Sequence, residues 1–235
     1  KFVRQLAQKK QRDHHHLFVA EGHKVIQEFI KENYQVHQLF ALDQTLFSSH
    51  QVSLVSHSEM KAMSALKTPS DALAVFTKPN DQSLSQSKLI LALESIQDPG
   101  NLGTIIRICD WFGIQDIVCS SDTVDCYNPK VIRSTMGSLA RVGVSYKNLQ
   151  PWLKDMGDRQ IVATTMAGQS VYDYEFNGPT VLVIGNEGRG LSNEILEVAN
   201  DAVSIPRYGG AESLNAAMAT GIIVAEARRK NPTEK

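Results

Sequence analysis

The chain lacks long apolar runs, paired cysteines and an excess of charge of either sign. Apolar runs such as Val181–Ile184 fall far short of the ~20 residues that cross a bilayer, and the polar N-terminus has no apolar signal segment. We therefore expect no membrane contact. Cys109, Cys119 and Cys126 have no spacing typical of a disulfide framework or a zinc site, which favours a reducing cytoplasm and no bound metal.

The net charge of -1 gives no general argument for nucleic-acid binding. One local exception is the segment Lys1–Lys31, which contains seven lysines and arginines but only three acidic residues. The segment also contains His14, His15, His16 and His23. This segment is either a solvated helix face or a surface for RNA. Charge alone slightly favours the solvated face.

What the chain does contain is a globular composition, 42% hydrophobic and 21% charged. Residues 78–88 are polar and serine-rich and are predicted to be a linker. Residues 1–77 are predicted to form a small α/β domain. Its expected strands are His16–Ala20, Val36–Ala41, Val52–Ser56 and Leu73–Phe76, and its expected helices are Gly22–Lys31 and Ser58–Leu66.

Residues 89–235 alternate regularly between apolar runs and helical patterns, which predicts a mostly parallel sheet covered on both faces. The expected strands are Leu89–Leu93, Asp116–Cys119, Val142–Ser145, Ile161–Thr165, Val181–Ile184 and Ala202–Ile205. The expected helices are Asn101–Phe112, Pro129–Leu139, Pro151–Met156, Ser192–Ala199 and Ser213–Lys230. Such sheets bind ligands beyond the carboxyl ends of their strands, so the loops there are the candidate site.

Three of these loops are polar and carry glycine. In the first, Glu94–Arg107, a helix is expected to begin near Asn101 as its N-cap, with Arg107 near the same side. Alone, it is an ordinary capped helix with a solvated arginine. The second, Gly185–Ser192, matches neither a Walker loop nor the dinucleotide fingerprint, so we expect it to hold something other than pyrophosphate.

The third loop, Ile205–Asn215, precedes the last helix and includes Ser213, which alone could be only an N-cap. Three such loops at strand ends indicate a ligand site more strongly than any one of them.

At these residues the chain resembles the SpoU/TrmH family of RNA 2'-O-methyltransferases, within the SPOUT superfamily. The matching segments are Asn101-x-Gly-x-x-x-Arg107, Asn128-Pro-Lys-Val-Ile-Arg-Ser134 with Gly137, Ile184-Gly-Asn-Glu-Gly-x-Gly-Leu191, and Ile205-Pro-x-x-Gly209 with Glu212-Ser-Leu-Asn215. They stand in family order within residues 89–230. The segment Phe18–Lys24 is similar to the start of the substrate-binding domain that many members carry.

The resemblance implies an enzyme that transfers a methyl group from S-adenosylmethionine to a ribose 2'-hydroxyl of a structured RNA. It implies a trefoil-knotted parallel-sheet methyltransferase domain, knotted around residues 181–215, behind the small α/β substrate-binding domain. It also implies a homodimer with the catalytic centre near the subunit interface. The resemblance assigns cofactor binding to Thr164, Gly185, Asn186, Ile205 and Leu214. It assigns catalysis to Asn101, Arg107, Glu187, Ser213 and Asn215.

Two points stay open from the residues. The family assigns the general base to the arginine matching Arg107, but a guanidinium normally stays protonated, so this residue either deprotonates the ribose hydroxyl or orients a phosphate. Arg207 and Tyr208 stand where the family often has a small or methionine-like residue, which leaves the accommodated RNA open. The extra N-terminal domain favours ribosomal RNA over transfer RNA by analogy.

Two other classes of protein compete with this interpretation. A non-catalytic knotted module that only binds RNA is disfavoured because every candidate catalytic residue is present. A nucleotide-dependent oxidoreductase is disfavoured because the dinucleotide loop and its acidic ribose partner are missing.

Overall fold

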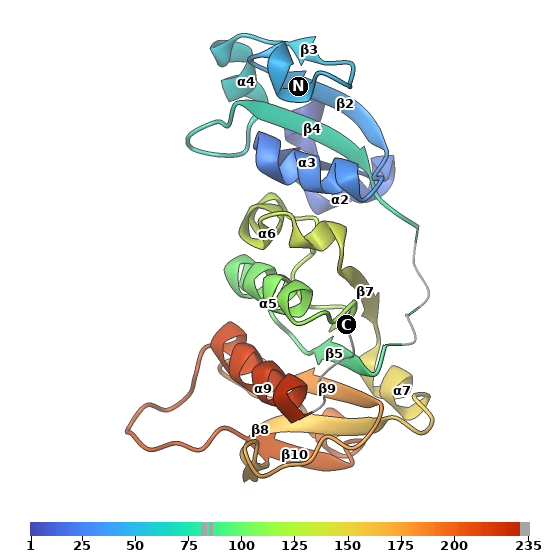
Figure 1. Ribbon diagram of the computed structural model, residues 1–235, viewed down its shortest axis with the longest axis vertical. Coiled ribbons are helices and arrows are strands. Elements are labelled where there is room, and N and C mark those ends of the chain that lie inside the picture. Colours follow the sequence, from blue (N-terminus) through green and yellow to red (C-terminus); the bar gives the residue numbers. More distant parts are fainter. Residues whose placement is uncertain (81–83, 85–86, 231–235) are drawn as a thin grey trace. The chain divides into compact units, whose positions relative to one another are not determined.

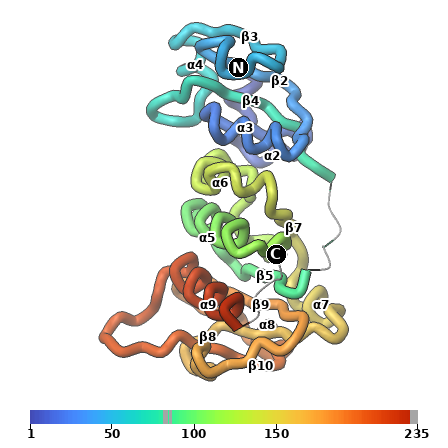
Figure 2. Tube along the Cα trace, viewed as in Figure 1, coloured from blue at the N-terminus to red at the C-terminus, as the bar shows by residue number. Residues whose placement is uncertain are grey.

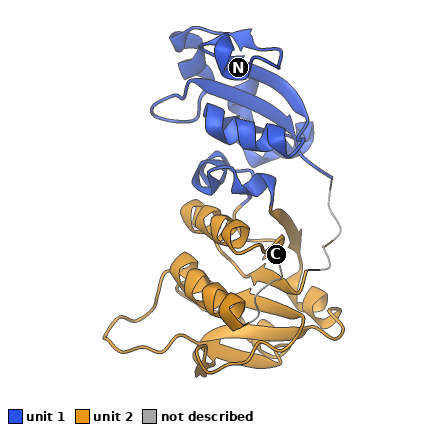
Figure 3. Ribbon diagram, viewed as in Figure 1, with its two compact units in different colours: residues 1–81, 125–141 blue, residues 82–124, 142–235 orange. Residues whose placement is uncertain are grey.

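The computed structural model describes residues 1–80, 84 and 87–230, and Figure 1 labels its elements. Its contacts divide the chain into two compact units, which Figure 3 colours separately. The first unit holds Lys1–Asp81 and Asp125–Arg141, and the second holds Gln82–Val124 and Val142–Lys235. The predicted linker at 78–88 lies partly outside the described residues, and its described part contains no helix or strand.

The first unit is built on a four-stranded mixed sheet. Its strand order is β1 (Leu17–Glu21), β4 (Ala72–Thr77), β2 (Val36–Ala41) and β3 (Ser53–Leu54). The central strand β4 runs antiparallel to both β1 and β2, and all its residues except the last are buried. The expected strand at Val52–Ser56 pairs with β2 over two residues only, at the sheet edge.

Helices of the first unit pack on two clusters, an aromatic core around Phe18 and an aliphatic cluster that includes Val3, Met60 and Leu73. The helices are α1 (Phe2–Gln5), α2 (Lys9–His15), α3 (His23–Lys31), α4 (His57–Met63) and α6 (Pro129–Thr135), with 3-10 turns η1 (Gln44–Phe47) and η2 (Ser138–Ala140). The Phe18 ring lies 5.2 Å from Phe29, 5.5 Å from Phe76 and 4.7 Å from Tyr127 between centroids. Tyr127 therefore connects residues 125–141 to this core, although in the chain these residues follow β6 (Asp116–Ser120) of the second unit.

The helix expected over Pro129–Leu139 is interrupted. Helix α6 ends at Thr135 because Met136 and Gly137 both adopt a left-handed backbone, with φ of 52° and 97°. A Cβ on Gly137 would lie 2.7 Å from Cγ of Glu28, so the chain also approaches α3 too closely there for a side chain.

The second unit contains a six-stranded sheet with every pair parallel, as the sequence predicts. Its order is β10 (Asp201–Ser204), β8 (Gln160–Ser170), β9 (Thr180–Ile184), β5 (Leu89–Leu93), β6 (Asp116–Ser120) and β7 (Gly143–Lys147). Every residue of β5 and β9 is buried, which matches a sheet covered on both faces. Strand β5 pairs with β6 on one side and with β9 on the other, so the direction in which the sheet is built reverses at β5.

Helices cover both faces of this sheet. The helices are α5 (Pro99–Trp111), α7 (Leu149–Lys154), α8 (Asn193–Leu196) and α9 (Ala216–Lys230). Residues Leu149, Leu153 and Ile195 of α7 and α8 pack on one face with Ile90 and Val183. Helices α5 and α9 lie side by side, as the tube in Figure 2 shows.

The helices α5 and α9 run in the same direction. Asn215 contacts Asn101 where both helices begin, and Arg228 donates to the Gly113 carbonyl where both end. Their N-termini therefore lie beside the carboxyl ends of the strands, where the site is expected. None of the described helices is both long and apolar enough to cross a membrane.

Candidate active site

The first polar loop leads from β5 into α5, which begins at Pro99. Asp98 is the N-cap, because its carboxylate accepts a hydrogen bond of 2.8 Å from the Asn101 N–H. The prediction that Asn101 caps this helix is therefore wrong. Since Asp98 does the capping, the Asn101 side chain can bond elsewhere.

The second polar loop folds back on itself directly after β9. Asn186 and Gly190 pair as an antiparallel bridge, with N–H to carbonyl distances of 3.2 and 2.9 Å. The Asn186 Oδ1 also accepts from the N–H groups of Gly188 and Arg189. A Cβ on Gly185 would lie 2.5 Å from the Gly190 carbonyl carbon, so the turn closes only around glycine.

A hydrogen-bond network that the sequence did not predict supports this loop. The Asn186 Nδ2 donates to the Ser95 carbonyl at 2.9 Å, and Ser95 has a left-handed backbone with φ of 57°. The Ser95 hydroxyl donates to Asp122 at 2.5 Å, and its N–H donates to the Ser120 hydroxyl at 2.8 Å. Ser95 and Asp122 therefore position the loop from the neighbouring strand ends.

The charge of Asp122 is favoured by the same contacts. Burial alone raises the pKa of this carboxyl, but hydrogen bonds from Ser120 and Ser95 outweigh burial and hold the pKa below its ordinary value. Ser95 and Asp122 follow buried strand runs, but nothing in their residue types marks them as a pair.

The third polar loop runs from β10 to α9, which begins at Ala216 and not at Ser213. Asn215 caps this helix, because its Oδ1 accepts from the N–H groups of Ala217 at 3.0 Å and Met218 at 3.3 Å. The N-cap of this helix is therefore Asn215 and not Ser213.

Asn101 joins the three loops. Its Nδ2 donates to Oε1 of Glu187 in the second loop, and its Oδ1 accepts a hydrogen bond of 2.8 Å from Nδ2 of Asn215. Glu187 and Asn215 stand 86 and 114 residues away from Asn101 in the chain. They form a polar cluster at the carboxyl end of the sheet.

A cavity of about 740 Å³ lies between the second and third loops. Its lining includes every candidate cofactor residue, Thr164, Gly185, Asn186, Ile205 and Leu214. Glu187 and Ser213 of the candidate catalytic set line it too. The volume falls within the range of about 300–1,000 Å³ that small-molecule sites occupy.

Arg107 has a different position from the rest of the candidate set. Its side chain is exposed on α5 and does not line the cavity, and it makes no hydrogen bond within the described residues. Ser213 is also exposed, but it lines the cavity. The structure therefore brings together Asn101, Glu187 and Asn215, and leaves Arg107 outside this group.

A parallel α/β sheet with a large cavity at the ends of its strands defines a protein that binds a nucleotide-sized ligand. Residues 88–225 match the SpoU rRNA Methylase family, and residues 1–74 match the MRM3-like substrate binding domain. The chain belongs to the SpoU rRNA methylase family. The resemblance seen in the sequence is confirmed.

Named relatives cover nearly the whole chain. Over 229 residues the chain is 31% identical to the 23S rRNA (guanosine(2553)-2'-O)-methyltransferase RlmP of Bacillus subtilis, covering 94% of this chain and 92% of that protein. An AdoMet-bound rRNA methyltransferase from Sinorhizobium meliloti has a TM-score of 0.89 and 30% identity, covering 99% of this chain and 94% of that one. The SpoU methyltransferase AviRb from Streptomyces viridochromogenes, solved with AdoMet, has a TM-score of 0.87 and 26% identity, with 100% and 97% covered.

Proposed function

We propose that the chain transfers a methyl group from S-adenosylmethionine to a ribose 2'-hydroxyl of ribosomal RNA. The observation that carries this proposal is the Asn101 cluster at the edge of a cavity lined by every candidate cofactor residue. Membership of the SpoU family and the rRNA activity named for the Bacillus subtilis relative support the reaction and the substrate class.

The cavity fits an adenosine-containing cofactor. Ile205, Leu214 and Ile223 provide apolar lining for a planar ring, and the turn at Gly185 brings backbone close to the cavity. Backbone groups suit the polar edge of adenine, because both have donors and acceptors in fixed geometry. When bound, S-adenosylmethionine supplies an electrophilic methyl group on a sulfonium.

Positioning is the main task of this chain's own residues. Methyl transfer requires the attacking oxygen in line with the breaking bond, so a fixed ribose contributes much of the rate. We assign that task to Asn101, Glu187 and Asn215, whose hydrogen bonds fix one another, and to the exposed hydroxyl of Ser213 at the same cavity. The ribose hydroxyl must also lose its proton, which requires a base.

The test combines cofactor binding with product mapping. Calorimetry of the purified chain should detect S-adenosylmethionine and not NAD, and binding of NAD alone would overturn the assignment. Mass spectrometry of 2'-O-methyl sites should find one site in ribosomal RNA that is lost from cells without the gene. Loss only from transfer RNA would point to the alternative substrate, and cofactor binding without any lost site would favour a non-catalytic module.

A Glu187→Gln variant separates positioning from folding. It keeps the shape of the side chain and an oxygen that can accept from Asn101, but it removes the negative charge. We expect at least a ~100-fold lower kcat, because a residue held for the reacting geometry contributes on this scale. Glu194→Gln, on α8 and outside the cavity lining, is the matched control and should keep the wild-type rate.

We also propose that the chain acts as a homodimer through α5 and α9. Trp111 on α5 is 85% exposed and Met218 on α9 is 62% exposed, and the two helices are neighbours. Exposed large apolar side chains on two neighbouring helices favour association. Arg107 lies four residues before Trp111, so it shares this face of α5 and would enter the interface with it.

In such a dimer, Arg107 completes the partner's site. A mixed dimer of Arg107→Ala and Glu187→Gln subunits, purified with two tags, should then recover about half the wild-type rate, since one of its two sites is intact. No recovery would place Arg107 in its own subunit's site. A pH–rate profile of Arg107→Lys tests its role as base, which an active variant with an unchanged profile would contradict.

The remaining features follow the family. We infer a trefoil knot around residues 181–215, because the chain carries the three family motifs in order. We place the reaction in the cytoplasm, which three buried cysteine thiols and a ribosomal RNA substrate support. Division into a substrate-binding domain over 1–77, a linker over 78–88 and a methyltransferase domain over 89–235 is supported by the two family matches.

A further inference from the structure

The loop between β10 and α9 projects away from the sheet of the second unit (Figure 1). Residues 207–215 are all exposed and belong to no helix or strand. The cofactor candidates Ile205 and Leu214 stand near its two ends, which leaves its tip unassigned. Arg207 and Tyr208 are large side chains between these two ends.

Tyr208 has the most exposed large hydrophobic side chain of the described residues, at 93%. It nevertheless lines the cavity, as Arg207 and Arg189 do. A ring that borders a ligand site and has both faces accessible is suited to stack on another planar ring. A single exposed tyrosine is common on protein surfaces, so the argument depends on its neighbours.

Arg207 and Arg189 bring two guanidinium groups to the same cavity. Arg207 Nη1 donates to the Ala211 carbonyl at 3.4 Å, a long hydrogen bond that leaves most of its donors available. Arg189 comes from the second loop and is also exposed. Arginine recognises phosphate through paired donors, so an aromatic ring and arginines at one cavity match the base and phosphate of one nucleotide.

Access to a ribose hydroxyl favours a nucleotide outside a regular RNA helix. A ribose inside a regular RNA helix is held by its neighbours, and proteins read RNA mostly through unpaired bases that are splayed out and stacked on aromatic side chains. Resting on the proposed function, we propose that Tyr208 is the stacking platform for the base of an unpaired RNA nucleotide at the cavity rim, with Arg207 on its phosphate.

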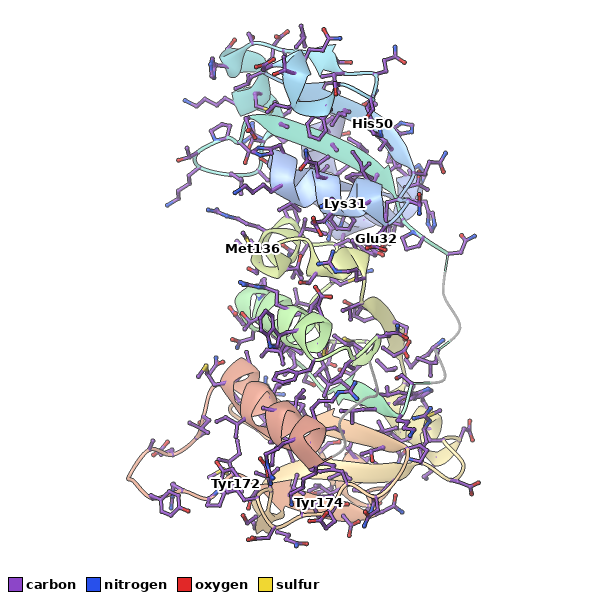
Figure 4. The ribbon with its side chains drawn as sticks, viewed as in Figure 1. Lys31, Glu32, His50, Met136, Tyr172 and Tyr174 are labelled. Carbon is purple, nitrogen blue, oxygen red and sulfur yellow. The ribbon has the colours of Figure 1, made fainter. Side chains whose placement is uncertain are left out.

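The test compares two Tyr208 variants with a matched tyrosine control. Tyr208→Phe keeps the ring, Tyr208→Ala removes it, and Tyr172→Ala removes a 46% exposed tyrosine of the same unit that does not line the cavity (Figure 4). The probe is deproteinised ribosomal RNA from cells lacking the gene. Direct binding of a fluorescein-labelled RNA hairpin with an unpaired loop is measured by anisotropy.

We expect Tyr208→Ala to raise the KM for RNA and the anisotropy Kd about tenfold, the scale of one lost stacking contact. Tyr208→Phe and Tyr172→Ala should stay within about twofold of wild type, because neither loses that contact. The calorimetric Kd for S-adenosylmethionine should not change. A raised cofactor Kd in Tyr208→Ala would show a lid over the cofactor instead, and an unchanged RNA Kd would refute the platform.

Arg207→Gln tests the phosphate contact separately. Its log Kd for the hairpin should depend less steeply on log salt, by about 0.7 for one phosphate on a single strand. An unchanged slope would contradict the contact. Because anisotropy measures binding without turnover, a wild-type chain that binds RNA through Tyr208 but methylates none would refute the proposed function alone.

Discussion

The buried ion pair between Arg12 and Asp125 provides the sharpest test of how the first unit is held together. Arg12 is 2% exposed, and its Nη2 and Nε lie 2.5 and 3.0 Å from Oδ2 of Asp125. Its Nη1 also donates to the carbonyls of Leu6 and Ala7 at 2.9 and 2.8 Å. One guanidinium therefore connects the N-terminal helices to the segment 125–141.

Replacing Arg12 by alanine leaves the Asp125 carboxylate buried, with 10% of its side chain exposed, and without its charged partner. Breaking a buried pair in this way costs about 3–5 kcal/mol, because the remaining charge is uncompensated. The double variant Arg12→Met with Asp125→Asn removes both charges and should lose less than Arg12→Ala. A smaller loss of unfolding free energy in the double variant would identify the unpaired Asp125 carboxylate as the cause of the destabilisation in Arg12→Ala.

The assay must report on the first unit. Both tryptophans, Trp111 and Trp152, lie in the second unit, so tryptophan fluorescence does not report on the first unit. Amide hydrogen exchange in β1 and β4 measures the opening free energy of the first sheet directly. Lys9→Ala, which breaks only the exposed pair with Asp13, is the control and should cost at most about 1 kcal/mol. A loss of less than about 1 kcal/mol in Arg12→Ala would refute the reasoning.

Two further predictions concern the glycine-containing loop after β9 and the stability of the fold in acid. In Gly185→Ala the new Cβ would lie 2.5 Å from the Gly190 carbonyl carbon, so calorimetry should show at least about tenfold weaker cofactor binding. Gly188→Ala in the same loop, where the Cβ would lie 3.6 Å from the nearest atom, should bind normally. Hydrogen bonds and charge from Lys78 and Lys9 outweigh the effect of burial and lower the pKa of Asp13 to about 2. Because that pKa lies below the unfolded value of about 3.9, Asp13 stabilises the fold above pH 4 and loses this effect as the pH falls toward 2. Asp13→Asn should therefore lower the thermal midpoint at pH 7 and less so at pH 3, and an equal shift at both would contradict this.

The second sheet could be predicted because its strands are buried along their whole length. Continuous apolar runs such as Leu89–Leu93 and Val181–Ile184 show no alternation, which is typical of parallel strands under helices. The place of residues 125–141 could not be predicted. They follow β6 in the chain, yet their contacts with Arg12, Phe18 and Glu28 are made over more than a hundred residues, where local pattern carries no signal.

The candidate site was predictable as three loops but not as a set of contacts. Asp98, Asn101, Ser213 and Asn215 are all residue types that cap helices, so composition could not choose among them. Arg107 was expected near the side of Asn101, but six residues turn a helix by about 600°, which leaves the two side chains about 120° apart. The absence of Arg107 from the Asn101 cluster follows from this rotation.

The Asn101 amide is the part of the site that only an asparagine can provide. Its Nδ2 donates to a carboxylate oxygen of Glu187, while its Oδ1 accepts from Nδ2 of Asn215. An aspartate would set a second negative charge against Glu187, and an apolar residue would satisfy neither neighbour. Asn215 in turn uses its own Oδ1 to cap α9. The start of α9, the start of α5 and the loop after β9 are thus connected through one amide, so the geometry of this polar cluster depends on all three strand ends at once.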